Sequence, residues 1–517
     1  MIDDAFKNMS SNFEANFQDV ITRSLNKLTS SGLSHDEDVD NLPDNEQNLG
    51  VPGPPPVFLF GNAFEVLQQN RSYTDSVWVK KYGRFIGYYQ GTRPTLLVTD
   101  AELIKKILVK DSKHFMNRQK LNFYHEMWNE NMFNAFDEKW KKIRSVTSPA
   151  FTTGKLRAMH PLMTKCIDKL ELYFDSLLIG NSFVTINDFK DAISGFTVDV
   201  IASTSFATDI DSNGKIESPF VQNGKKLFDI NRLRALVCFV FPKFLIQLLN
   251  VKTFFPPTPF NFFINLSQEI VKQRKRGEVK RNDFVQLLLD SAIDESQLAN
   301  LDYNKLTMEI IAQCFLFFVA GFDTTATSIV NLLYILAKNP TVQEKLYQEI
   351  ITNTANISDN HSTEYYDKVV NDLPYLEATI KETLRMYPPF TVLFRRVGTD
   401  GYKLNGVLLP KDMLVEVSNW VVHYDPEYFP EPLKFDPDRF LPENKHLIVP
   451  YSYLPFGDGP RNCVGMRFAI QEMKLMTARV LTKYCFEKAN ETPEELTFQK
   501  GSPLLSPKTF PLQIRKR

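Results

Sequence analysis

One short run of the sequence contains the residues best suited to hold a metal-containing cofactor: Phe456-Gly-Asp-Gly-Pro-Arg-Asn-Cys463-Val-Gly465. It places a single cysteine in a glycine-rich turn, directly before a pattern that predicts an amphipathic helix starting near Met466. The unpaired N–H groups and positive dipole end of that helix favour a thiolate at Cys463, which could bind iron. The glycines leave room for a flat cofactor, and Arg461 could meet an anionic group on it. A buried structural cysteine is the alternative, but it does not call for this spacing of five residue types.

A second run places polar groups inside a helix that should be buried. Residues 309–337 are predicted to form a long central helix, because their first half is apolar on nearly every face. Within it, Asp323 and Thr324 supply an acid and a hydroxyl, and a helical threonine can bond its i−4 carbonyl or release it to hold a water. Gly321 is costly in a helix interior, which indicates close approach by another group. Alone, this run would fit a helix face emerging into solvent; beside an iron thiolate it would form a proton route to bound dioxygen.

A third pattern consists of charged residues. Glu382 and Arg385 stand at i, i+3 of a predicted helix that ends at Tyr387-Pro388-Pro389. Arg439 lies in a later segment, Pro437-Asp-Arg439-Phe440. Such spacing is common at protein surfaces, so its meaning depends on its position among the other motifs.

Taken in order along the chain, these motifs resemble those of the cytochromes P450, over roughly nine-tenths of the sequence from about residue 50. The resemblance implies haem b (iron protoporphyrin IX) as the cofactor and Cys463 as its metal ligand. It also implies that Asp323 and Thr324 are catalytic, as the acid and alcohol that deliver protons. The network implied to hold the cysteine loop consists of Glu382, Arg385 and Arg439.

The resemblance further implies which side chains contact the cofactor. Trp140 and Arg144 stand at i, i+4 of a predicted helix, so both can point toward one haem propionate. Each arginine, taken singly, could equally be a solvated side chain. The predicted cofactor-binding residues are Arg118, Trp140, Arg144, Arg396, Phe456, Arg461 and Cys463. The predicted substrate contacts, which rest on position within family segments, are Phe123, Phe133, Val319, Ala320, Val392, Leu393, Leu504 and Leu505.

The expected fold class is mostly α with minor β. Most segments after residue 101 have helical periodicity, whereas residues 85–89 and 95–98 are β-like runs, with further short strands near 392–422 and at the C-terminus. The resemblance implies the cytochrome P450 fold, a triangular helical body with a central long helix and small β-sheets. Segments 199–206, 219–223 and 281–287 are most similar to the animal microsomal drug- and steroid-oxidising branch.

Three parts are predicted along the chain. Residues 1–29 form an acidic amphipathic N-terminal segment, 30–50 a polar linker, and 51–517 the catalytic domain. Residues 1–29 hold no run of about 18 apolar residues, although the branch usually begins with a membrane-spanning anchor. The apolar, proline-broken segment 235–265 is either an internal lid or a patch that meets lipid. We therefore expect peripheral attachment to the cytosolic face of the endoplasmic reticulum membrane, with the cytoplasm as the alternative.

Composition excludes several other classes of function. A formal net charge of -1 gives no reason to expect a nucleic-acid partner. Five scattered cysteines form neither a disulfide framework nor a zinc spacing, which favours a reducing compartment.

The resemblance implies a monooxygenase that inserts one oxygen atom from dioxygen into an apolar steroid, lipid or xenobiotic. No G-x-G-x-x-G run follows a predicted strand, so electrons should come from NADPH through a separate reductase, NADPH–cytochrome P450 reductase, with cytochrome b5 as a further partner. The predicted docking residues are Lys141, Lys142, Lys474 and Arg479. The rivals are a haem-thiolate isomerase or dehydratase, and a non-catalytic haem or lipid carrier. Neither needs the acid–alcohol pair Asp323 and Thr324.

Overall fold

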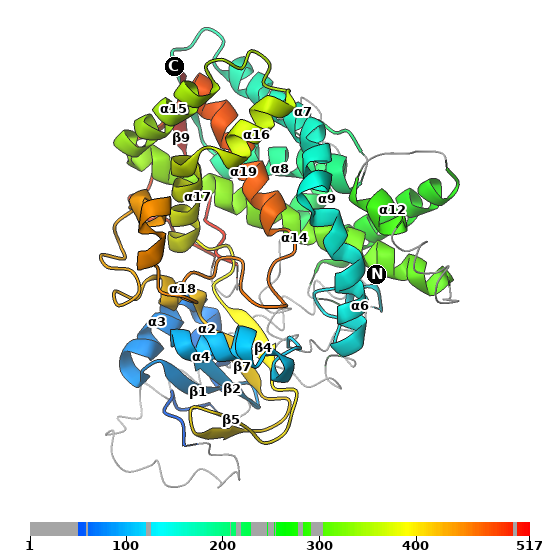
Figure 1. The fold of residues 1–517 in the computed structure, drawn as a ribbon, viewed down its shortest axis with the longest axis vertical. Helices are drawn as coiled ribbons and strands as arrows, with labels where there is room; N and C mark the ends of the chain where they lie inside the picture. The colour runs from blue at the N-terminus through cyan, green and yellow to red at the C-terminus, as the bar shows by residue number, and fades with distance from the viewer. Residues whose placement is uncertain are drawn as a thin grey trace, which may run out of the picture. The chain divides into compact units, whose positions relative to one another are not determined.

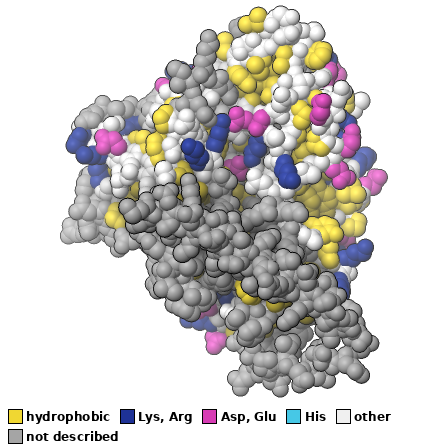
Figure 2. Space-filling view, turned by 180° about the vertical axis from the view of Figure 1, so that it is seen from behind, with side chains coloured by type: hydrophobic (Ala, Val, Ile, Leu, Met, Phe, Trp, Pro, Cys, Tyr) yellow, Lys and Arg dark blue, Asp and Glu magenta, His cyan; other side chains and the backbone are white. Residues whose placement is uncertain are grey.

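The structure, a computed structural model, describes residues 50–517 apart from 58–59, 120–125, 207, 213–218, 229–245, 247–252, 254, 278–282, 291–302 and 500–503. The described residues belong to one unit, Gly50–Arg517. The predicted N-terminal segment 1–29 and all but the last residue of the predicted linker 30–50 lie outside the described part. On the face drawn in Figure 2, positive and negative side chains are interspersed over the described surface, as the near-neutral net charge suggests.

The long central helix predicted from the sequence is α14, Tyr303–Lys338, which crosses the middle of the ribbon in Figure 1. Within the described chain it is the one helix long and apolar enough to cross a membrane, but 78% of its most apolar window is buried inside the protein. It is therefore a core helix. Gly321 has the close neighbour that the sequence indicates: a Cβ there would lie 2.5 Å from Cδ1 of Ile201 on α8, Phe189–Ser205.

Helices from distant parts of the sequence surround α14. It contacts α8 most extensively, and it also packs against α12, Pro257–Lys275, α17, Pro374–Met386, and α19, Met466–Lys483. The other helices are α2 Ala63–Gln68, α3 Arg71–Tyr82, α4 Ala101–Lys105, α5 Glu126–Asn129, α6 Asp137–Thr147, α7 Thr153–Leu177, α9 Pro219–Leu227, α15 Pro340–Thr354, α16 Thr363–Asn371 and α18 Asn419–His423, with short 3-10 or π turns η2 Lys106–Lys110, η3 Ser112–His114, η4 Ser148–Phe151, η5 Pro437–Phe440 and η6 Pro442–Leu447.

Small β-sheets complete the described fold, which is mostly α with minor β as predicted. The four-stranded sheet has the order β1-β2-β7-β4, with β2 and β7 parallel and the other pairs antiparallel. A three-stranded sheet has the order β3-β9-β8, and β5 pairs with β6. The strands are β1 Phe85–Gln90, β2 Arg93–Val98, β3 Phe183–Ile186, β4 Leu393–Arg396, β5 Tyr402–Leu404, β6 Val407–Leu409, β7 Leu414–Val417, β8 Tyr484–Lys488 and β9 Leu512–Lys516.

The proline-broken apolar segment lies only partly in the described residues. Pro257 is the first residue of α12, where its missing N–H costs no helical hydrogen bond. The described phenylalanines of the segment are mostly core residues: Phe260 and Phe263 are buried, and the Phe263 ring stacks on that of Phe318 with centroids 4.0 Å apart. This end of the segment thus packs inward rather than toward lipid.

A buried ion network joins α17 to the segment that precedes the cysteine loop. Glu382 and Arg385 are fully buried, and Arg385 donates from Nε and Nη2 to the two Glu382 carboxylate oxygens at 2.7 and 2.9 Å. Arg439 Nε lies 3.6 Å from Glu382 Oε1. His423 extends the network toward the loop, because its ring contacts the Arg385 carbonyl and accepts from the N–H of Leu454 at 2.8 Å. Burial, with the charge of Arg385, lowers the pKa of His423 to about 3, so this ring is neutral.

Glu382→Leu should destabilise the protein by about 3–5 kcal/mol, because it leaves Arg385 buried without its carboxylate. Chemical unfolding followed by circular dichroism measures this free energy. The matched control is Glu138→Gln, which removes the exposed partner of Lys141 and should change the free energy of unfolding by less than about 1 kcal/mol. A loss for Glu382→Leu no larger than that of the control would contradict the structural importance of the network.

Candidate functional site

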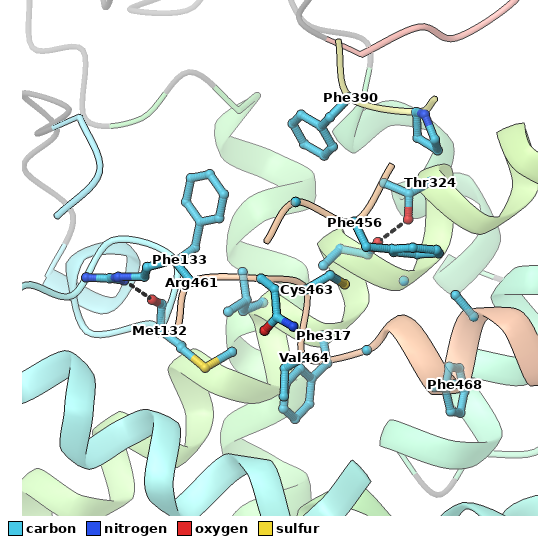
Figure 3. A pocket seen from close by; sticks show the side chains of 18 of the residues that line it. Met132, Phe133, Phe317, Thr324, Phe390, Phe456, Arg461, Cys463, Val464 and Phe468 are labelled. Carbon is cyan, nitrogen blue, oxygen red and sulfur yellow. Dashed lines mark hydrogen bonds between the residues drawn. The ribbon is translucent and has the colours of Figure 1, made fainter. Parts of the chain in front are cut away.

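A cavity of about 260 Å³ lies between α14, α6, β4 and the loop that precedes α19. Cys463 stands in its wall, and the lining is otherwise mostly aromatic and aliphatic. In Figure 3, Phe133 and Phe390 lie above the cysteine, whereas Phe317, Val464 and Phe468 lie below it. The sulfur therefore opens into a space whose two sides are apolar, as a flat, largely hydrophobic cofactor requires.

The cysteine loop owes its shape to one glycine above the others. Gly459 has φ of +71°, and a Cβ at this position would lie 1.8 Å from the carbonyl oxygen of Leu108 in η2. No other residue fits there without moving the backbone. The loop closes where the N–H of Cys463 donates to the carbonyl of Phe456 at 2.9 Å. Phe456, for which the sequence predicts a cofactor contact, lines the cavity.

The protonation of Cys463 reflects two opposed effects. Its side chain is open to the cavity but otherwise enclosed by protein, and this burial raises the pKa of the thiol. The N–H groups of Gly465 and Met466, at the start of α19, and the charges of Arg144 and Arg118 lower it. The helix start thus favours the thiolate as predicted, but burial outweighs it. A metal cation in contact with the sulfur would supply the remaining stabilisation of the anion.

A cluster of arginines is the second feature of the cavity. Burial lowers the pKa of each of the four arginines that line it, to about 10 for Arg118, about 9 for Arg395 and about 8 for Arg461. Mutual repulsion adds to this effect for Arg118, Arg395 and Arg461. Within the described residues, none of Arg118, Arg144, Arg395 and Arg461 forms an ion pair with a carboxylate. Such a cluster calls for an anionic ligand, and the two propionates of haem fit it.

The same arginines hold the cysteine loop against the segment before α6. Arg461 donates to the carbonyls of Met116 and Ala135, both at 2.8 Å, and its guanidinium stacks 4.0 Å from the Trp140 ring centroid. Arg144 donates to the carbonyl of Asn462 at 2.9 Å and to its side chain at 2.8 Å. Arg118 donates to the carbonyl of Arg461 at 2.9 Å. The sequence predicts that Arg461 binds an anionic group, but its guanidinium donates mainly to backbone carbonyls.

The structure differs from the prediction at Arg396. Its guanidinium lies over the Phe136 ring, 5.0 Å from the centroid, and contacts Asp412 at 3.2 Å, so it does not line the cavity. Its neighbour Arg395 does. The contacts with Asp412 and the Phe136 ring hold the Arg396 side chain away from the cavity. The sequence places an arginine on this strand but does not determine which of the two faces the cavity.

Of the predicted acid and alcohol on α14, only the alcohol lines the cavity. Thr324 lines the cavity, and its hydroxyl donates to the carbonyl of Ala320 at 2.5 Å (Figure 3). Asp323 is buried but outside the cavity, with its carboxylate 3.2 Å from Nζ of Lys190 on α8. Successive helical residues point about 100° apart, and this turn directs Asp323 toward α8 while Thr324 faces the cavity. The Lys190 partner comes from a segment that no local motif connects to α14.

The predicted substrate contacts divide into three groups. Phe133, Ala320, Val392 and Leu393 line the cavity. Val319 packs against the core, Leu504 pairs with Phe390 in an isolated β-bridge, and Leu505 is fully buried, so these three do not line it. Phe123 lies outside the described residues.

Several lining residues carry no sequence signal of their own. Phe390 follows the helix-ending Pro388-Pro389 pair, and Ser205 is the last residue of α8. Phe317 could have been found, because it precedes Gly321 by one helical turn. The others reach the cavity through tertiary packing alone, which spacing along the chain does not encode.

Comparisons with known proteins agree with this geometry. A family model described as Cytochrome P450 matches residues 51–514. The chain is 37% identical over 478 residues to Cytochrome P450 3A56 of Fundulus heteroclitus, with 91% of this chain and 92% of that protein covered. It is 37% identical over 481 residues to Cytochrome P450 3A7 of Homo sapiens, with the same coverage. It is 36% identical over 470 residues to Lithocholate 6-beta-hydroxylase of Mesocricetus auratus, covering 87% of this chain and 88% of the relative. The match spans the cavity, the cysteine loop and the ion network alike, and the chain belongs to the cytochrome P450 family, whose members bind haem and oxidise apolar substrates with electrons from a redox partner.

Proposed function

We propose that residues 51–517 form the catalytic domain of a monooxygenase that hydroxylates or epoxidises apolar molecules of steroid, lipid or xenobiotic type, with electrons from NADPH–cytochrome P450 reductase. One observation carries the proposal: the Cys463 sulfur opens into a mostly apolar cavity edged by arginines that form no ion pair with a carboxylate of the described residues. When bound, haem supplies the activation of dioxygen. The protein would supply the thiolate of Cys463 as the metal ligand, the cations for the propionates, the substrate cavity and the protons.

Proton delivery is assigned to the alcohol and acid on α14. The Thr324 hydroxyl donates to the Ala320 carbonyl, and it can exchange that bond for one to a water or substrate oxygen in the cavity. Asp323 lies one residue away and is held by Lys190. We assign Asp323, beside Lys190, the role of taking up protons. We assign Thr324 the role of holding, through its hydroxyl, the water or substrate oxygen in the cavity.

The walls of the cavity define the substrate class. Phe133 and Phe390 lie on the same side of Cys463 as drawn in Figure 3, and Val392 and Leu393 continue the apolar lining. A relative whose name is Lithocholate 6-beta-hydroxylase supports steroid-like substrates for this chain. Apolar walls discriminate by only about 1–3 kcal/mol per methylene, so several apolar substrates should be accepted.

Docking of the reductase is assigned to α6, where Lys141 is exposed and where Arg144 of the same helix bonds the cysteine loop. Two of the four predicted docking residues do not fit this role. Lys474 is buried and pairs with Glu377 at 2.9 Å, and Arg479 is buried and pairs with Glu171 at 2.7 Å. They hold α19 in place and are not available to a partner. Cytochrome b5 is the second partner that we propose for the same face.

For location, we propose the cytosolic face of the endoplasmic reticulum membrane. The amphipathic pattern of residues 1–29 supports peripheral attachment.

Cys463→Ser should abolish both turnover and the red-shifted Soret band of the reduced, carbon-monoxide-treated enzyme. A serine hydroxyl remains protonated and cannot replace the thiolate donor. Absorption spectroscopy of purified enzyme with matched haem content measures this. A red-shifted band in the variant would contradict the role of Cys463.

Thr324→Ala should bind substrate as the wild type does but divert electrons from NADPH into peroxide and water. The variant loses the hydroxyl in the cavity and keeps the apolar walls. Product formed per NADPH consumed is the measurement, with Thr324→Ser as the control that restores the hydroxyl. Equal coupling in the alanine and serine variants would show that the hydroxyl is not needed.

Lys141→Glu should raise the reductase concentration needed for half-maximal turnover several-fold at low salt, and the effect should shrink as salt screens the charges. Lys403→Glu, an exposed lysine on β5, is the matched control and should leave this concentration unchanged. Equal behaviour of the two variants would remove α6 from the docking surface.

A further inference from the structure

Of the arginines that line the haem cavity, Arg395 has the fewest hydrogen bonds to described residues. It is 4% exposed, and its Nη1 donates to the carbonyl of its own neighbour, Phe394, at 2.8 Å. Its Nε and Nη2 donate to no group in the described part of the chain. A guanidinium carries several N–H donors, so most of the donors of this buried cation lack an acceptor. A charge buried in this way calls for a ligand, because it is costly without partners.

The other arginines of the cavity hold the cysteine loop in place. Arg118 and Arg144 each donate to a backbone carbonyl of that loop at 2.9 Å, and Arg461 donates to carbonyls of the segment before α6 at 2.8 Å. Arg395 lies instead on β4, the strand that also supplies Leu393 to the apolar lining. It therefore belongs to the wall that we assign to the substrate.

The cofactor alone leaves positive charge in this cavity unbalanced. Haem has two propionates, whereas Arg118, Arg144, Arg395 and Arg461 line the cavity. The charges of ferric iron, the porphyrin dianion and a cysteine thiolate sum to zero, so they do not remove the excess. Among the described carboxylates, that of Asp137 raises the pKa of Arg461, but none acts on Arg395. Burial, with the charge of Arg118, lowers the pKa of Arg395 to about 9, so Arg395 is still a cation at neutral pH.

The next residue on β4 shows the alternative arrangement. Arg396 has its guanidinium 3.2 Å from the carboxylate of Asp412 and over the ring of Phe136, away from the cavity. Its charge is thus balanced within the protein. Arg395 lines the cavity and forms no ion pair with a carboxylate of the described residues. Consecutive arginines on one strand therefore differ in one respect: only Arg395 is left open to a ligand that enters the cavity.

We propose that Arg395 binds the acid group of the substrate, so that the enzyme favours amphipathic lipids with a carboxylate at one end, such as fatty acids, over neutral molecules of the same size. A guanidinium binds a carboxylate through two parallel N–H···O bonds, and Nε and Nη2 form the free edge for such a pair. The apolar chain of the acid would then lie along the lining that includes Leu393. This assignment rests on the proposed monooxygenase function and narrows its substrate class.

Binding of a matched acid and ester to the purified holoenzyme tests the proposal without turnover. Dodecanoate and methyl dodecanoate are titrated by calorimetry. The wild type should bind the acid about tenfold more tightly than the ester, because only the acid forms charge-assisted hydrogen bonds. Arg395→Leu should remove this preference by weakening the acid alone, and Arg395→Lys should keep part of it, because it retains the charge but not the planar fork. The control is Lys403→Gln, which removes an exposed positive charge on β5 and should change neither affinity.

Equal affinity of the wild type for acid and ester, no binding of the acid, or an equal loss of both ligands in Arg395→Leu overturns the proposal. Haem content per protein tests the competing role: a loss in Arg395→Leu but not in Lys403→Gln would assign Arg395 to a propionate and also overturn it. If Arg395→Leu does not fold, Arg395→Gln carries the test, and an unchanged preference for the acid overturns the proposal. A wild type without the red-shifted Soret band contradicts the monooxygenase function itself, whereas a normal band with equal affinities contradicts this inference alone.

Discussion

The excess of buried positive charge beside Cys463 is the constraint on which the rest of the site depends. Arg118, Arg144, Arg395 and Arg461 line one cavity, and burial lowers the pKa of each. Backbone carbonyls around Arg461 offset part of this cost and tie the cysteine loop to the segment before α6. A bound anion would offset more of it. Binding of a cofactor with two carboxylates therefore stabilises the folded protein as well as supplying the reactive metal, since a ligand that binds only the native state favours it.

On the opposite side of the loop, the buried charges are paired within the protein. Glu382 and Arg385 neutralise each other within the protein, and Arg439 adds a second cation at the edge. His423 is neutral because burial lowers its pKa. Its ring accepts a hydrogen bond from the N–H of Leu454, so the network also holds the chain just before the loop. On one side of the cysteine loop the charges are thus balanced within the protein, while on the other side the carboxylates of a cofactor would balance them. A loop anchored in this asymmetric way can present the sulfur in a defined position and still accept a large ligand.

Sequence reasoning succeeded where a local pattern determines the structure. The cysteine loop, the central helix and the pairs on α6 and α17 are all fixed by spacing within a few turns. It failed where the direction or the burial of a side chain depends on packing between segments that are distant in the sequence. Arg395 rather than Arg396 faces the cavity because Asp412 and the Phe136 ring hold Arg396 elsewhere, and Asp323 turns to Lys190 because α8 packs there. Lys474 and Arg479, predicted to be exposed, are buried because acidic residues of α17 and α7 reach them. Burial of a charged residue is decided by its tertiary partners, which no spacing rule encodes.

The contact between Gly321 and Ile201 has a consequence for how the enzyme can evolve. A Cβ at position 321 would lie 2.5 Å from Ile201, and Ile201 itself forms part of the cavity wall. The two helices therefore pack in close contact at this point. The size of the side chain at position 201 limits how closely α8 and α14 approach here, so one substitution there would change the shape of the cavity without touching the cysteine loop.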